Sequence, residues 1–116
     1  MRDIRGTILD MIEAIERAQR LSVGLNEAKF FGDERTQWAI YSQILILGEA
    51  ANRLDRTFQT SHPEIPWSNV IGMRHRLVHG YDNVDWGRVW TTLNDDLPPL
   101  LEHLKTFLQE GGSYGT

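Results

Sequence analysis

Hydrophobic positions along this chain recur at steps of three and four residues, which is the period of an α-helix. No stretch shows the alternation of apolar and polar residues that is typical of a half-buried strand. From Asp3 to Leu21 the apolar positions form one face, made of Ile4, Ile8, Met11, Ile15 and Ala18. The pattern predicts a first amphipathic helix here, followed by a connection from Asn26 to Asp33.

A second helix is predicted to begin near Asp33 or Thr36 and to end near Leu54. One stripe of this helix consists of Ile40, Ile44, Leu47, Ala51 and Leu54, and a second stripe beside it consists of Trp38, Tyr41 and Leu45. A helix that is apolar on two sides is buried on two sides. The second stripe therefore faces either the centre of a small bundle or another subunit, and the sequence leaves both open.

Residues 55–66 are predicted to form a loop, and Pro66 to open a third helix that ends at Gly80. Asp85 is a candidate N-cap for a fourth helix. That helix contains Pro98 and Pro99, which lack backbone donors, so we expect a kink or break near Leu97. The sequence thus predicts an all-α fold, an antiparallel bundle of four to five helices, with one domain over residues 1–110 and a flexible tail over residues 111–116.

The composition limits the number of domains, the kinds of catalytic or metal site and the cellular location that we expect. The chain has 116 residues, 41% of them hydrophobic, and no cysteine. These values fit one globular domain and exclude disulfides, thiolate zinc sites and a cysteine nucleophile. No apolar run approaches the roughly 18 residues that span a bilayer, and the N-terminus lacks a signal-peptide pattern. We expect a cytoplasmic protein without a membrane partner.

The charge balance bears on nucleic-acid binding. The formal net charge is −4, and the pI is about 5.5, whereas nucleic-acid binders usually carry a basic face. This balance argues against tight nonspecific binding of RNA or DNA. It leaves room for a small basic site on an acidic body.

The densest chemistry lies in residues 74–81, which read Arg-His-Arg-Leu-Val-His-Gly-Tyr. On a helical wheel, Ser68, Gly72, His75 and His79 fall on one polar face. An imidazole can act as general base or acid, and a nearby guanidinium such as Arg74 can bind a phosphate at two points. Those groups suffice for RNA cleavage without a metal ion, because the ribose 2′-hydroxyl supplies the nucleophile.

The spacing Arg74-x4-His79-x-Tyr81 resembles the signature of HepT-like proteins, minimal members of the HEPN superfamily. The resemblance extends to residues 46–50, 71–74, 84–85 and 96–98, and so covers most of the chain. It implies an all-α homodimer in which two motifs line a shared cleft. The chain would be the ribonuclease toxin of a type VII-like toxin–antitoxin system, paired with an MNT-type nucleotidyltransferase antitoxin.

The resemblance also implies roles for single residues. Arg74 and His79 would be catalytic, and Tyr81 would accept AMP from the antitoxin, which would block the site and repel RNA phosphate. The family usually has Asn after the Arg, whereas this chain has His75. His75 would assist catalysis or orient His79, so the choice of general base between the two histidines stays open.

Other interpretations of these residues remain. His75 and His79 could share a metal ion with Asp82 or Asp85, although we expect no metal and no cofactor. Glu49 would support the motif by pairing with Arg74 or Arg53, or it would lie at an edge facing solvent.

Among the remaining arginines, Arg76 and Arg88 are the candidates for binding RNA, whereas Arg53 and Arg56 are interpreted as solubilising. The tryptophans are interpreted as core or interface residues. The alternative function is a binding module that docks a nucleotidyltransferase and binds nucleotide or phosphate without cleaving RNA.

Overall fold

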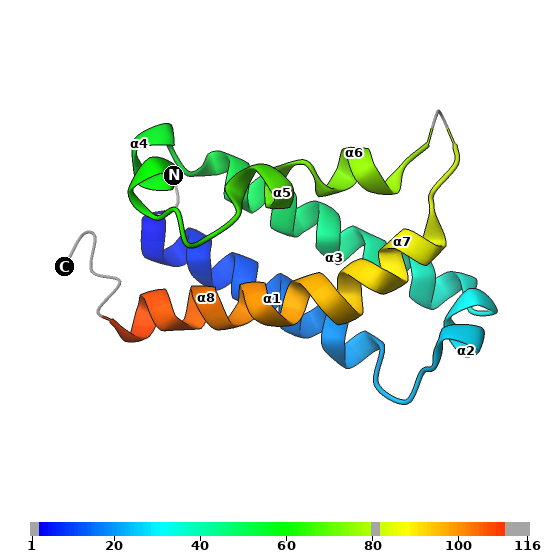
Figure 1. Ribbon diagram of the computed structural model, residues 1–116. Coiled ribbons are helices and arrows are strands. Elements are labelled where there is room, and N and C mark those ends of the chain that lie inside the picture. Colours follow the sequence, from blue (N-terminus) through cyan, green and yellow to red (C-terminus); the bar gives the residue numbers. More distant parts are fainter. Residues whose placement is uncertain (1–2, 80–81, 111–116) are drawn as a thin grey trace.

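The computed structural model describes residues 3–79 and 82–110, and within these ranges the regular structure is helical (Figure 1). The elements, in chain order, are α1 (Ile4–Leu21), α2 (Glu27–Phe31), α3 (Glu34–Arg53), α4 (Arg56–Ser61), α5 (Trp67–Ile71), α6 (Met73–Leu77), α7 (Trp86–Thr91), the π-helical segment η1 (Thr92–Asp96) and α8 (Leu97–Gln109). The all-α class expected from the sequence is confirmed.

The two long helices predicted from the periodicity are confirmed as α1 and α3, which pack along each other. Each begins at a capping aspartate. The Asp3 carboxylate accepts a hydrogen bond from the Gly6 backbone N–H at 2.6 Å, and the Asp33 carboxylate accepts one from the Thr36 backbone N–H at 3.1 Å. Such caps satisfy donors that the first helical turn leaves unpaired.

Two segments predicted to be loops contain short helices instead. The connection before α3 holds α2, capped by Asn26 and anchored by the fully buried Phe30. The stretch after α3 holds α4, capped by Asp55 and anchored by Phe58, which is 4% exposed. One buried aromatic residue holds each of these helices against the core.

The single helix predicted from Pro66 to Gly80 is wrong, because the segment is divided into α5 and α6 at Gly72. A Cβ atom at Gly72 would lie 2.9 Å from the Ser68 carbonyl oxygen, too close for any other residue without a shift of the backbone. Glycine therefore permits the tight turn between the two short helices.

The end of the motif helix also differs from the expectation, since α6 ends at Leu77 rather than at Gly80. Val78 is extended, with φ −113° and ψ 121°, and pairs with Val84 in an isolated antiparallel bridge. The His79 N–H donates to the Asn83 carbonyl, and the Asp85 N–H donates to the Leu77 carbonyl, both at 2.6 Å. A β-branched residue favours this extended geometry.

Near Leu97, where the sequence predicted a kink or break, the helix continues and only its type changes. Figure 1 shows α7 and α8 in one continuous run, and η1 lies between them, with the Leu97 N–H donating to the Thr92 carbonyl five residues back. Pro98 and Pro99 follow in the first turn of α8, where their missing donors are tolerated. The wider π turn therefore accommodates the prolines without breaking the helix.

The core lies between α1, α3 and α8, with α5 and α6 packed over α3. The first stripe of α3 is buried, as expected, but Trp38 of the second stripe is 45% exposed, and Tyr41 and Leu45 are only partly buried. Within this chain the second stripe therefore does not lie at the centre of the bundle. In the described ranges, no helix combines the length and the apolar character needed to cross a bilayer.

Candidate functional site

Arg74 and His75 of α6 line one pocket with residues of α3. The pocket has a volume of about 290 Å³, and its other lining residues are Ile44, Leu45, Gly48, Glu49, Asn52 and Ile71. The short helices lie close to α3 because Gly48 has no side chain: a Cβ atom there would be 3.3 Å from the Val70 carbonyl oxygen. The sequence thus places a guanidinium and an imidazole against a helix rich in small and apolar residues.

Glu49 shares this pocket but does not pair as one of our two interpretations expected. Its side chain is exposed, and among the described residues no ion pair joins it to Arg74 or Arg53. The edge position facing solvent is the interpretation that the structure favours. Arg74 has no carboxylate partner within the described ranges, so its donors can reach a bound anion.

His79 lies beyond the end of α6, next to the isolated bridge between Val78 and Val84. Its ring Nε2 lies 3.2 Å from Oδ2 of Asp85, and the two side chains are 59% and 38% exposed. The backbone pairing of Leu77 with Asp85 brings the two side chains together. A carboxylate on one ring nitrogen fixes the orientation and tautomer of an imidazole, which leaves Nδ1 available for proton transfer.

Asp85 has a second contact that fixes it in place. Its Oδ1 accepts a hydrogen bond from the Arg88 backbone N–H at 3.0 Å, so the residue caps α7 as predicted. This hydrogen bond is the main reason that the pKa of Asp85 lies below its ordinary value of 3.8, despite partial desolvation. The hydrogen bond to His79 and the charges of His79 and Arg88 lower the pKa further. The carboxylate is therefore ionised at neutral pH and attracts a protonated His79.

The helical wheel that placed His75 and His79 on one face is wrong, because α6 ends before His79. The i, i+4 relation on which a shared metal ion depended is absent as a result. Within the ranges described, no group of three or more His, Asp or Glu side chains is arranged to hold a metal ion. Tyr81, together with Gly80, lies outside the described residues.

The Asp85 contacts predict a pH-dependent stability. The folded-state pKa of Asp85 lies below 3.8. The ionised Asp85 carboxylate therefore contributes fully to the free energy of unfolding above pH 3.8, and this contribution is lost as the pH falls through the folded-state pKa. Asp85→Asn keeps a capping oxygen but removes the charge. We expect the urea midpoint of the variant to lie below that of the wild type near neutral pH, and the difference to shrink in acid. A difference that is equal at both pH values would contradict this account.

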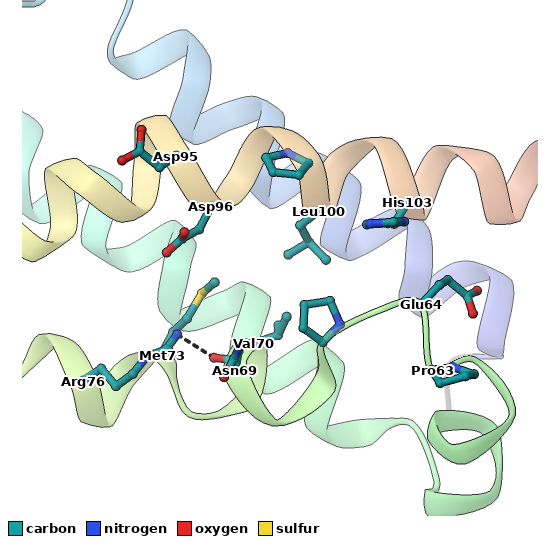
Figure 2. A pocket seen from close by; sticks show the side chains of 12 residues that line it. Pro63, Glu64, Asn69, Val70, Met73, Arg76, Asp95, Asp96, Leu100 and His103 are labelled. Atoms are coloured by element: carbon teal, nitrogen blue, oxygen red, sulfur yellow. Dashed lines mark hydrogen bonds between the residues drawn. The ribbon is translucent and has the colours of Figure 1, made fainter.

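Arg76 lies on the opposite flank of α6 and lines another pocket, of about 420 Å³ (Figure 2). Its guanidinium donates to the Asn69 carbonyl at 2.8 Å. Asp95, Asp96 and Glu64 line the same pocket, so carboxylates outnumber the single arginine there. Arg88, by contrast, is exposed on α7, beside Asp85.

Sequence reasoning missed the pairing of His79 with Asp85 and the presence of Asn52 beside His75. Asp85 carried a signal, since a capping residue follows His79 by six positions. That signal indicated a helix start or a ligand of a shared metal ion, and no hydrogen bond to His79. Asn52 carried none, because it reaches the pocket only through the packing of α5 and α6 on α3.

Comparisons with known proteins identify the family to which the chain is similar. Residues 11–107 match the family model described as "Ribonuclease HepT-like". The chain is 36% identical over 91 residues to a protein of Thermococcus cleftensis named "Probable ribonuclease HepT", an alignment that covers 78% of this chain and 83% of the relative.

Two further relatives carry names that describe them as putative RNases. One, from Caldanaerobacter subterraneus subsp. tengcongensis, is 31% identical over 75% of this chain and 78% of its own length. The other, from Methanocaldococcus jannaschii, is 22% identical over 90% of this chain and 95% of its own length. No solved structure matches the chain significantly.

Proposed function

The chain belongs to the HepT-like ribonuclease family, and we propose that it cleaves RNA through Arg74 and His79 without a metal ion. The observation that carries this proposal is the pairing of an exposed imidazole with an ionised carboxylate, close in sequence to a guanidinium that has no carboxylate partner among the described residues. An oriented base and a two-point phosphate ligand are the groups that this reaction requires.

The proposed reaction is an internal displacement at phosphorus. The base removes the proton of the ribose 2′-hydroxyl, the 2′-oxygen bonds to phosphorus, and the bond from phosphorus to the 5′-oxygen breaks. An acid protonates that leaving oxygen, which yields a 2′,3′-cyclic phosphate and a 5′-hydroxyl end. His79 and His75 are the candidates for base and acid, and Arg74 stabilises the charge that builds on the phosphoryl oxygens.

We propose that the working form is a homodimer in which both motifs line one cleft. The second stripe of α3 supports this, because its Trp38 is 45% exposed although it is large and apolar. Ile46, elsewhere on the same helix, is also apolar and 43% exposed. The same helix continues to Glu49, which lines the pocket of Arg74. Two copies paired along this stripe would bring their pockets together, and sedimentation equilibrium would give a dimer mass; a monomer at every concentration would contradict the proposal.

We further propose that the chain is the toxin of a toxin–antitoxin pair and that an MNT-type nucleotidyltransferase silences it by transferring AMP to Tyr81. Incubation with that partner and ATP is expected to add the mass of one or more adenylyl groups and to abolish cleavage, because bulk and negative charge would oppose RNA phosphate. Tyr81→Phe is expected to remain unmodified and active. Modification of this variant at the same level would assign the acceptor to another residue.

The nucleophile is tested with two oligonucleotides of one sequence, one made of ribose and the other of deoxyribose. In excess EDTA the RNA is expected to be cleaved to cyclic phosphate ends, whereas the DNA stays intact because it lacks the 2′-hydroxyl. Cleavage of the DNA, or dependence on added metal ions, would contradict the mechanism. Stable binding of the nucleotidyltransferase without RNA cleavage under any condition would favour the binding-module alternative.

A further inference from the structure

Beside the pocket of Arg74 lies a second pocket, of about 560 Å³, lined by Leu54, Arg56, Gln59, Ser68 and Gly72 in addition to three shared residues. The shared residues are Asn52, Ile71 and His75, which line both pockets. The two hollows therefore adjoin and form one groove that runs from Arg74, past His75, to Arg56. We call this surface the α3–α4 groove.

The charges of the α3–α4 groove differ from those of the pocket on the other flank of α6. Its charged lining residues are Arg56, Arg74 and Glu49, two cations against one carboxylate. The pocket on the other flank of α6 has three carboxylates, Glu64, Asp95 and Asp96, against Arg76, as Figure 2 shows. On a chain of net charge −4, the groove is the more favourable of these two surfaces for a phosphate chain.

Arg56 is held at the far end of the groove by ordered local structure. The Asp55 carboxylate caps α4 by accepting a hydrogen bond from the Phe58 N–H at 2.7 Å, and Phe58 is buried in the core. Gln59 donates to the Leu54 carbonyl at 2.8 Å, which ties α4 to the end of α3. Arg56 itself is exposed and forms no ion pair with any carboxylate in the described ranges.

We propose that the α3–α4 groove binds a single-stranded segment of the RNA substrate, with Arg56 holding a phosphate next to the one that Arg74 contacts. The inference rests on the proposed ribonuclease function and extends it. It assigns an RNA contact to an arginine that the sequence indicated to be solubilising. Asn52 and His75 lie between the two cations, where the sugar and base of the intervening nucleotide would contact them.

The test compares Arg56→Gln with Arg53→Gln, a matched control. Arg53 is also exposed, lies three residues earlier, and lines neither pocket. The probe is a fluorescent single-stranded RNA with 2′-O-methyl groups, which binds but cannot be cleaved through its 2′-oxygen. Anisotropy titrations over a range of salt concentrations give the affinity and its salt dependence.

We expect Arg56→Gln to bind this probe about fivefold more weakly than the wild type. The slope of log K (the binding constant) against log salt concentration is expected to become less negative by roughly 0.7, the value of one lost phosphate contact on a single strand. Arg53→Gln is expected to match the wild type, and Arg56→Lys to recover most of the slope. Circular dichroism of each variant reports that the fold is kept.

The outcomes separate this proposal from the ribonuclease function. If the wild type cleaves RNA but Arg56→Gln and Arg53→Gln bind the probe alike, the groove proposal is overturned and the ribonuclease function stands. If the wild type cleaves nothing yet binds the probe in an Arg56-dependent manner, the groove stands and the function changes to binding. Absence of any RNA binding by the wild type would overturn both.

Discussion

Arg74→Ala is expected to lower the rate of RNA cleavage by about 10²- to 10³-fold, the usual cost of removing a donor that stabilises charge in a transition state. Arg74 is exposed, shares a pocket with His75 and has no ion-pair partner in the described part of the chain. Its guanidinium can therefore bind two phosphoryl oxygens at once. Single-turnover cleavage with saturating protein measures the chemical step without the contribution of binding.

Two variants distinguish this role from simple attraction of RNA. Arg74→Lys keeps the charge but loses the planar two-point geometry, and we expect it to remain well below the wild-type rate. Arg53→Ala removes a similar charge from the exposed end of α3, outside the pocket, and we expect the wild-type rate. Full activity of Arg74→Ala at saturation would remove this residue from the chemical step.

His79→Ala is expected to lower the rate by about 10²- to 10⁴-fold, the range that positioned acid–base groups contribute. The His79 ring is half-exposed and is oriented by Asp85 at 3.2 Å. Removing the ring therefore abolishes its proton transfer without leaving a cavity in the core. The urea midpoint is expected to fall only slightly, because His79 contributes little buried surface. The rate and the midpoint are measured on the same preparation.

His103→Ala provides a matched control for a lost imidazole. His103 is exposed on α8 and lines the acidic pocket on the other flank of α6, so we expect the wild-type rate. A comparison of His75→Ala with His79→Ala then shows which of the two motif histidines is the general base. If His75→Ala loses the pH dependence of the rate and His79→Ala keeps it, the base is His75.

Much of the fold could be predicted because α1 and α3 are long, periodic and capped by Asp3 and Asp33. Short helices do not show such periodicity. The helices α2 and α4 form because Phe30 and Phe58 pack into the core, and only the tertiary structure decides that. The break at Gly72 likewise depends on a steric contact with the Ser68 carbonyl that no local pattern reveals.

The candidate site could be predicted in part for the same reason. The sequence singled out the motif from the density of its chemistry, but it assumed one helix through His79. Pairing of Val78 with Val84 ends that helix and turns His79 toward Asp85. The contact between His79 and Asp85 joins residues that are not helical neighbours, so the helical wheel could not predict it. Arg56 lines the groove because α4 packs against the end of α3. The sequence pattern had predicted a loop for this segment.

The most direct measurement is RNA cleavage by purified wild-type protein and by His79→Ala, assayed side by side in excess EDTA. The account predicts cleavage by the wild type that survives the chelator and is lost in the variant, while both proteins keep the same circular dichroism spectrum. Equal behaviour of the two proteins, whether both active or both inactive, would contradict a ribonuclease centred on this motif.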